Sequence, residues 1–205
     1  MLKLVIAGLL GYLIGSVTFG VLIPKFMGSD GDIRNEGSGS VGATNVLRTR
    51  GKLQGGLVLA GDLAKGLAAV GAGYAIGGVQ CAAIAGACAI LGHCFPLYFG
   101  FKGGKAVATS AGAIFLLFPK AMLILIPVFV IAVAVSRIVS VGSLLAAVTL
   151  VLCVFLFYPP APVTAFCLAA AALVIWKHKD NIRRILSGTE NKLDFNSAKK
   201  NNHSD

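Results

Sequence analysis

Long apolar stretches, separated by short polar segments, cover most of the chain. The first runs from Leu4 to Ile23 and ends at Pro24-Lys25, which is about the 20 residues that a membrane-spanning helix needs. Six further stretches follow, at about Leu53–Val79, Cys81–Phe99, Ala106–Phe118, Ala121–Ser136, Ile138–Phe157 and Val163–Trp176. Turns between them are predicted at Gly77-Gly78, Pro119-Lys120 and Tyr158-Pro159-Pro160. The pattern predicts an all-α polytopic membrane helical bundle of about seven transmembrane helices.

Three of these stretches, the fourth, the fifth and the seventh, are shorter than a bilayer requires. They are expected to thin the membrane, to use flanking residues or to be partly re-entrant. The first stretch could instead be a secretory signal peptide. Only Lys3 marks a basic start, however, and no A-x-A-like cleavage site follows, which favours a helix that is retained.

The composition also indicates a lipid environment. Hydrophobic residues make up 57% of the chain and charged residues 13%, and the mean hydropathy is +0.85. The 18 basic residues outnumber the 8 acidic ones, for a formal net charge of +10. This excess favours anionic lipid headgroups or a phosphate- or carboxylate-bearing substrate. The charges form no single stripe with interleaved aromatic residues, which disfavours nucleic-acid binding.

The cysteines lie in apolar stretches and lack the spacing of a zinc site or of a secreted disulfide framework. We interpret them as small packing residues. They are Cys81, Cys88, Cys94, Cys153 and Cys167.

The basic residues predict the orientation of the chain, because Lys and Arg near helix ends stay on the cytoplasmic side. With the N-terminus outside, 15 of the 18 basic residues lie in the cytoplasm, and the polar motifs fall on the same side. Lys3 and Lys120 are then outside, and Lys65 lies within a span. We therefore expect an outside N-terminus and a cytoplasmic C-terminus.

The segment between the first two spans contains the motif GSGSVGATN, from Gly37 to Asn45. Small residues let the backbone approach a ligand closely, and the hydroxyl and amide side chains offer hydrogen bonds. Arg48 follows Asn45 by three residues, so both would share one face of a helix. A flexible linker is the alternative. The length of about thirty residues exceeds a minimal connection and favours a functional loop.

A second motif, Lys102-Gly103-Gly104-Lys105, runs directly into an apolar segment. Its backbone N–H groups and the positive end of the following helix would point at an anion. It is not a Walker A loop, because the G-x-x-x-x-G-K-[ST] spacing is absent. Two stop-transfer lysines are the alternative interpretation. His93, earlier in the same stretch, is either a packing residue or a catalyst.

Two more polar clusters follow later spans. The segment from Ser136 to Ser143 offers hydroxyl groups at helical spacing, although helix capping alone would explain Ser140. The segment Trp176–Arg184 follows the last span, and its basic face could lie on anionic lipid. His178 and Asn181 within it are three residues apart and share a helical face, which a lipid anchor does not require.

Two charged residues lie inside the second predicted span. Asp62 and Lys65 are three residues apart, and charges at membrane depth mark either a mutual pair or a pathway. The spacing lets the two side chains satisfy each other, which favours a structural pair.

In this order, the motifs resemble those of bacterial glycerol-3-phosphate acyltransferases of the acyl-phosphate-dependent, integral membrane type, the PlsY family. GSGSVGATNVLR, GHCFPLYFGFKGGK and KHKDNIRRILSGTE stand at the three family motifs, and the resemblance extends through Glu190. It implies one membrane acyltransferase domain at 1–190, a polar tail at 191–205, and seven helices around a cytoplasm-facing pocket in the bacterial inner membrane. The implied reaction moves a fatty acyl group from acyl phosphate to the 1-hydroxyl of glycerol 3-phosphate, giving lysophosphatidic acid and inorganic phosphate in phospholipid biosynthesis.

The resemblance also implies roles for individual residues. The implied catalytic residues are Ser38, Arg48, Lys105, His178 and Asn181. The implied substrate-binding residues are Thr44, Asn45, Lys102, Gly103, Gly104, Ser140 and Ser143. Glu190 would hold the tail in place. The chain departs from the family where Ser40 replaces the usual Asn, Ala106 a frequent Gly and Lys179 a common Arg, so no specific role is assigned to position 40.

The charge pattern suits this activity, because both substrates carry phosphate and one carries a long acyl chain. An acyl phosphate has a good leaving group, so the protein mainly needs to position two anions and to neutralise their repulsion. The expected partners are acyl phosphate, glycerol 3-phosphate and membrane lipid. No cofactor, metal, nucleic acid or obligate protein partner is expected.

Two other functions remain open at this point. A transporter of an organic phosphate or other anion would also use broken helices, glycine-rich loops and charges within the membrane. Against it, the chain shows no internal repeat, and its polar motifs gather on one side. A non-catalytic lipid-binding scaffold would explain the basic tail but not the Gly-Gly-Lys loop.

Overall fold

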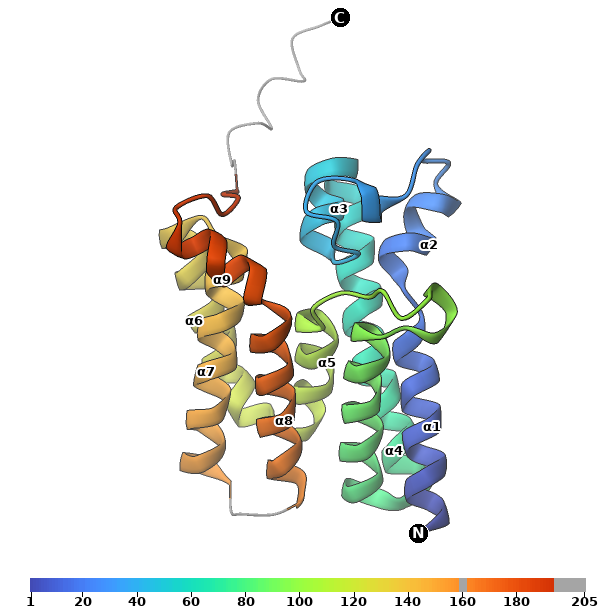
Figure 1. Ribbon diagram of the computed structural model, residues 1–205. Coiled ribbons are helices and arrows are strands. Elements are labelled where there is room, and N and C mark those ends of the chain that lie inside the picture. Colours follow the sequence, from blue (N-terminus) through green and yellow to red (C-terminus); the bar gives the residue numbers. More distant parts are fainter. Residues whose placement is uncertain (159–161, 194–205) are drawn as a thin grey trace, which may run out of the picture.

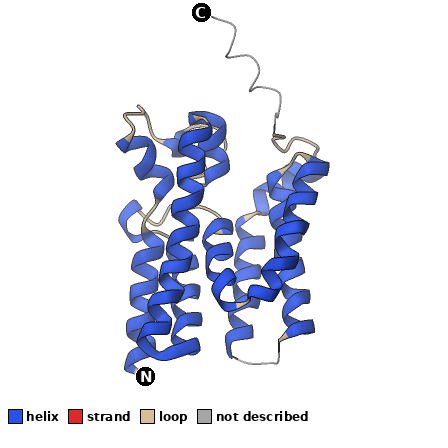
Figure 2. Ribbon diagram, turned by 180° about the vertical axis from the view of Figure 1, so that it is seen from behind, coloured by secondary structure: helices blue, strands red, loops and turns tan. Residues whose placement is uncertain are grey.

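The computed structural model describes residues 1–158 and 162–193 (Figure 1). Within this part of the chain the structure is helical and contains no strand (Figure 2), which confirms the all-α class. The helices are α1 Leu2–Ser16, α2 Phe19–Phe26, α3 Ala43–Arg50, α4 Lys52–Cys94, α5 Val107–Leu117, α6 Pro119–Ser136, α7 Val139–Phe157, α8 Pro162–Lys177 and α9 Lys179–Leu186, with short 3₁₀ helices η1 at Ile33–Asn35 and η2 at Leu97–Phe99. The predicted turn at Pro159-Pro160 and the tail beyond residue 193 lie outside the described residues.

Helix α4 consists of two arms that join at Gly77 and Gly78. Both glycines have non-helical backbone angles, and Gly78 has a φ of +73°, in the left-handed region that favours glycine. The arms fold back on each other, because a Cβ added at Gly73 would lie 2.5 Å from the Cα of Ala82. Figure 1 shows the chain descending through one arm of α4 and returning through the other.

Helix α1 packs against the second arm of α4 through small residues. A Cβ at Gly11 would lie 2.2 Å from the carbonyl oxygen of Ala85, and one at Gly15 would lie 2.1 Å from that of Ala89. Such close backbone approach is typical of helix pairs in membranes. Lipid provides no hydrophobic driving force for helix association, so helices associate through close packing at small residues. This contact fixes the end of α4 that carries His93.

The first predicted span is broken into two helices. Helices α1 and α2 meet at an angle of 42°, with Val17 and Thr18 between them. The break leaves the carbonyl of Val17 free, and Lys65 donates to it at 2.8 Å. Pro24 was predicted to stop the first helix, but it lies inside α2, which continues to Phe26.

The helices give the chain the character of a multi-pass membrane protein. In the described part of the chain, α4, α6 and α7 are each long and apolar enough to cross a bilayer, and α1 with α2 forms a bent pair that meets the same criteria. Helices α5 and α8 are apolar but shorter. The seven-helix count therefore stays a prediction, with α4 counted as two spans.

The polar motifs gather at one end of the bundle. Figure 1 places α2, α3 and α9 at the end opposite the N-terminus. Seen from either side, α6, α7 and α8 stand on one flank, α1 and α4 on the other, and α5 between them (Figures 1 and 2). The segments that carry the predicted site residues therefore meet above the centre of the bundle.

Candidate active site

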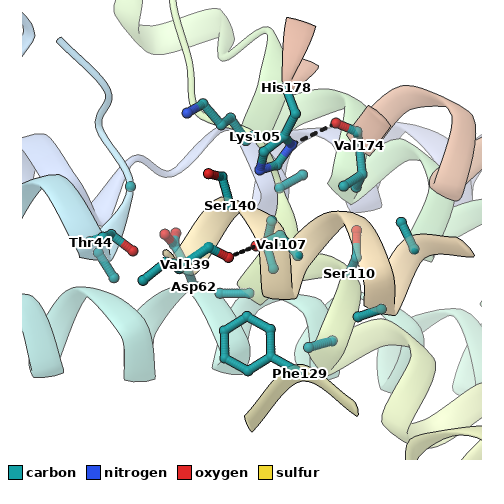
Figure 3. Close-up of a pocket in the computed structure, with 18 of the residues that line it drawn as sticks. Thr44, Asp62, Lys105, Val107, Ser110, Phe129, Val139, Ser140, Val174 and His178 are labelled. Carbon is teal, nitrogen blue, oxygen red and sulfur yellow. Dashed lines mark hydrogen bonds between the residues drawn. The ribbon is translucent and has the colours of Figure 1, made fainter. Parts of the chain in front are cut away.

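A cavity of about 310 Å³ lies where these segments meet. Its upper part is polar and is lined by residues of α3, α9 and the loops beside them. Its lower part is apolar and lies between α5, α6, α7 and α8, as Figure 3 shows for Val107, Phe129 and Val174. The predicted site residues that line the cavity are Ser38, Thr44, Asn45, Arg48, Asp62, Lys105, Ser140, Ser143, His178, Asn181 and Glu190.

Lys105 stands in the loop that leads into α5. Its Nζ donates to Oδ1 of Asn181 at 2.5 Å, across 76 positions of the sequence. Burial lowers the pKa of Lys105, because a buried ammonium loses hydration. This hydrogen bond holds the Lys102–Lys105 motif against α9 at the mouth of the cavity.

Glu190 is the acceptor at the centre of this polar cluster. One carboxylate oxygen accepts from Asn181 at 2.5 Å and from Ser140 at 2.8 Å, and the other accepts from Arg184 at 2.6 Å. Burial alone would raise the pKa of Glu190, but these three hydrogen bonds outweigh it and hold the pKa below its ordinary value. The carboxylate therefore stays ionised and ties α7, α9 and the start of the tail together.

Arg48 closes the mouth from the opposite flank. Its Nη2 donates to the carbonyl oxygen of Asn191 at 2.9 Å. Partial burial lowers the pKa of Arg48, and the nearby Arg184 lowers it further, while Glu190 opposes both effects. Arg48, Lys105 and Arg184 thus place three cations around one opening, which suits an anionic ligand.

Asn45 holds the first loop in shape. Its Oδ1 accepts from the backbone N–H of Ser38 at 2.9 Å, and its Nδ2 lies within hydrogen-bond distance of the carbonyls of Glu36 and Ser40, at 3.0 and 2.9 Å. The side chain is 3% exposed. Because these hydrogen bonds hold the preceding segment, Asn45 orders the residues that line the cavity. Its predicted contact with substrate stays a prediction.

His178 lies at the junction of α8 and α9, buried above the apolar part of the cavity. Its Nδ1 donates to the carbonyl of Val174 at 2.7 Å (Figure 3), so the neutral ring has an unprotonated Nε2. Burial lowers the pKa of His178 to about 4, and the neighbouring charge of Lys105 adds to the effect. His178 is therefore neutral at pH 7, with one nitrogen available as an acceptor.

The two serines of α7, Ser140 and Ser143, donate hydrogen bonds to different acceptors. Ser140 donates to Glu190 at 2.8 Å, and Ser143 donates to the carbonyl of Val139 at 3.1 Å. Both side chains are buried and line the cavity. Ser140 thus belongs to the polar cluster at the mouth, while Ser143 lies one turn further into the bundle.

The two glycines of the second motif approach His93 rather than open space. A Cβ at Gly103 would lie 2.0 Å from the carbonyl oxygen of His93, and one at Gly104 would lie 2.3 Å from its Nε2. Lys102 and Gly103 line a separate polar depression with Asp32 and Arg34. Of the four residues of the motif, Lys105 lines the cavity described above, and the substrate-binding roles of Lys102, Gly103 and Gly104 stay predictions.

Beneath this loop lies a buried cluster of three ionisable side chains. Lys65 lies 2.7 Å from Asp62 and 2.8 Å from Nδ1 of His93. Spacing in the sequence could pair Asp62 with Lys65, but it could not add His93, which reaches them only because α4 folds back at Gly77-Gly78. Asp62 and His93 also line the cavity.

The described residues contain no group of three or more His, Cys, Asp or Glu side chains placed to hold a metal ion. The five cysteines are free thiols.

An arrangement of this kind defines a class of protein: a helical membrane protein whose cavity takes a molecule with an anionic end and an apolar end. The model of the family described as glycerol-3-phosphate acyltransferase matches residues 5–188, and the chain therefore belongs to that family. Family membership favours an enzyme over the carrier and scaffold hypotheses.

Relatives and solved structures agree with this assignment. A glycerol-3-phosphate acyltransferase of Jannaschia sp. (strain CCS1) is 44% identical over 192 residues, which is 94% of each chain. One from Geobacillus kaustophilus (strain HTA426) is 41% identical over 185 residues, which is 90% of this chain and 93% of the relative. Crystal structures of PlsY (YgiH), an integral membrane glycerol 3-phosphate acyltransferase, are similar in fold, as its glycerol 3-phosphate form (TM-score 0.87, 37% identity, 93% of this chain and 96% of that chain) and its lysophosphatidic acid form (TM-score 0.85, 36% identity, 93% and 95%).

Proposed function

We propose that this glycerol-3-phosphate acyltransferase takes its acyl group from an acyl phosphate and transfers it to the 1-hydroxyl of glycerol 3-phosphate, giving lysophosphatidic acid and inorganic phosphate. One observation carries the proposal: a cavity whose mouth is ringed by Arg48, Lys105 and Arg184 continues into an apolar compartment between α5, α6, α7 and α8. The mouth suits two phosphate groups, and the compartment suits a fatty acyl chain.

The residues at the mouth of the cavity have different roles in this proposal. Arg48 and Lys105 neutralise the two phosphates, whose mutual repulsion would otherwise keep the substrates apart. Ser38, in the loop before α3, and Thr44, in the first turn of α3, offer hydroxyl groups. Asn181 and Glu190 orient Lys105 through the hydrogen bonds described above.

The transfer requires no covalent intermediate with the protein. The glycerol hydroxyl oxygen forms a bond to the acyl carbon, and the bond between that carbon and the phosphate oxygen breaks. The phosphate leaves with the electron pair, and the hydroxyl proton passes to a phosphate oxygen or to Nε2 of His178. Positioning the two substrates side by side is then the main contribution of the protein.

Donor choice tests the proposed function directly. Purified protein is expected to form lysophosphatidic acid from palmitoyl phosphate and glycerol 3-phosphate, with stoichiometric release of inorganic phosphate. Palmitoyl-CoA and palmitoyl-acyl carrier protein should give little or no product, because the mouth is built for a phosphate leaving group. Equal rates with a thioester donor would contradict the proposal. Uptake of glycerol 3-phosphate into protein-loaded vesicles without acylation would instead favour a carrier.

We further propose that the mouth of the cavity faces the cytoplasm of a bacterial cell, as the distribution of basic residues predicts. Single cysteines replacing Asn35 or Ser187, which are exposed at the polar end, should be protected from an impermeant thiol reagent in intact cells and should react in inverted vesicles. A cysteine replacing the exposed Lys3, at the opposite end, is the matched control and should show the reverse pattern. All variants are made in a protein without the five native cysteines. Labelling of Asn35→Cys from outside intact cells would contradict this orientation.

A further inference from the structure

The ammonium group of Lys65 has three acceptors within the bundle. Its Nζ lies 2.7 Å from Oδ1 of Asp62, 2.8 Å from Nδ1 of His93 and 2.8 Å from the carbonyl oxygen of Val17. A lysine ammonium has three N–H donors and no acceptor. Two of them are used in hydrogen bonds with Val17 and His93, and Asp62 forms an ion pair with the group. The side chain of Lys65 is 3% exposed.

This geometry determines the tautomer of His93. Because Lys65 can only donate, Nδ1 of His93 must be an unprotonated acceptor, and the neutral ring carries its proton on Nε2. Oδ1 of Asp62 also approaches Nδ1, but at 3.4 Å it is the more distant neighbour. With a neutral His93, the charges of Asp62 and Lys65 cancel, as a buried cluster requires.

The protonated nitrogen of His93 faces the loop of the second motif. A Cβ at Gly104 would lie 2.3 Å from Nε2, and the backbone N–H of Gly104 donates to the carbonyl oxygen of His93 at 3.1 Å. His93 lines the cavity, as does Lys105 one residue beyond Gly104. No residue in the described part of the chain forms a hydrogen bond with Nε2. A donor at the wall of a cationic cavity, without a hydrogen-bond partner in the described part of the chain, points to an anionic ligand.

We propose that His93 is a further catalytic residue, whose Nε2–H donates to a phosphate oxygen of a substrate held beside Lys105. Asp62 and Lys65 are positioning residues that fix the tautomer. The inference rests on the proposed function, because it takes phosphate-bearing substrates to occupy the mouth of the cavity. His93 and His178 then have opposite tautomers: Nε2 donates in the first and accepts in the second.

Nitrogen-15 NMR of the unsubstituted ring tests the tautomer without a change at the site. Full-length protein carrying labelled histidine and His203→Gln is placed in lipid nanodiscs, so that only His93 and His178 contribute signals. His93 is expected to have a protonated Nε2 and His178 a protonated Nδ1. Glycerol 3-phosphate or inorganic phosphate should shift the Nε2–H signal of His93. A protonated Nδ1 on His93, or no shift at saturating glycerol 3-phosphate and at saturating acyl phosphate, would overturn the proposal.

The kinetics of two substitutions test whether Nε2–H of His93 donates a hydrogen bond to substrate. His93→Leu removes it and should raise the KM for one of the two substrates by about 10- to 100-fold, the range expected for one hydrogen bond to a charged group. The substrate affected identifies which phosphate His93 contacts. His93→Gln can accept from Lys65 and donate to phosphate, so its KM should stay within about threefold of the unsubstituted value. If His93→Gln is impaired as much as His93→Leu while both remain folded, the ring has only a packing role.

The double substitution Asp62→Asn with Lys65→Met tests the positioning residues. It removes the ammonium without leaving an unpaired carboxylate, which would be costly when buried. His93 should then populate both tautomers, while the signals of His178 stay unchanged and serve as an internal control. An unchanged His93 tautomer would show that Lys65 does not set it.

The acylation assay keeps this proposal separate from the proposed function. If the unsubstituted protein forms lysophosphatidic acid from acyl phosphate but the His93 signal and the His93→Leu kinetics are unaffected, the proposal for His93 alone is wrong. If the unsubstituted protein uses only thioester donors, the proposed donor is wrong, whatever the NMR shows.

Discussion

Lys105→Met is expected to lower kcat/KM by about 10²–10³-fold, the loss that follows removal of one group that stabilises developing charge in a closed site. Lys105 is the cation that enters the cavity from the loop before α5, and Asn181 holds its Nζ at 2.5 Å. Methionine keeps most of the length of the side chain but removes the charge. The fall is measured in steady-state assays with each substrate varied in turn.

Lys102→Met is the matched control. Lys102 precedes the same two glycines, but it is exposed and lines the separate depression beside Asp32 and Arg34. Its loss should change kcat/KM by less than about threefold, as expected for a surface charge. Equal losses in the two variants would mean that general attraction of anions, and not contact within the cavity, explains the role of Lys105.

The apolar pattern predicted the helical class and the turn within α4, because Gly77-Gly78 interrupts a long apolar stretch and glycine tolerates a positive φ. It did not predict the break between α1 and α2. Val17 and Thr18 are not turn-forming residues, and the freed carbonyl of Val17 is satisfied by Lys65, 48 positions away. Such a break depends on a contact in the folded bundle, which the local sequence does not show.

The motifs predicted which polar residues lie at the mouth of the cavity, but not which partner each side chain binds. Lys105 of the Gly-Gly-Lys motif meets Asn181 and Glu190, which both belong to the last motif. Asn45 looked like a ligand-binding amide, yet the backbone of its own loop uses its side chain. Gly103 and Gly104 were predicted to form a cradle for phosphate; the structure adds that both pack against His93, which leaves no room for a Cβ at either position. Sequence spacing indicates the residue types a site requires, whereas partners depend on tertiary contacts.

Direct transfer predicts that no acyl-enzyme forms. Incubation of the protein with acyl phosphate alone, followed by intact mass measurement, should show no added acyl group. The reason is structural: the hydroxyl of Ser143 donates to a backbone carbonyl. The hydroxyl of Ser140 donates to Glu190, a carboxylate that also accepts from Asn181 and Arg184 and whose lowered pKa makes it a weak base for activating a serine. An adduct on Ser38, Ser140 or a cysteine that transfers its acyl group when glycerol 3-phosphate is added would contradict direct transfer.

His178→Ala should lower kcat by about 10²-fold, the cost of misplacing a reacting group, while the acid limb of the pH–rate profile stays in place. Burial holds the pKa of His178 at about 4, whereas the second pKa of a phosphate ester is about 6. Of the two acceptors proposed above, the phosphate is then expected to be the stronger base and to take the proton, and His178 is expected to orient the hydroxyl through its unprotonated Nε2. As the pH falls below about 6, protonation of the phosphate should slow the reaction in both proteins, before His178 itself becomes charged. Measuring kcat from pH 5 to 8 decides the point: if the acid limb disappears in His178→Ala, His178 is the group that accepts the proton.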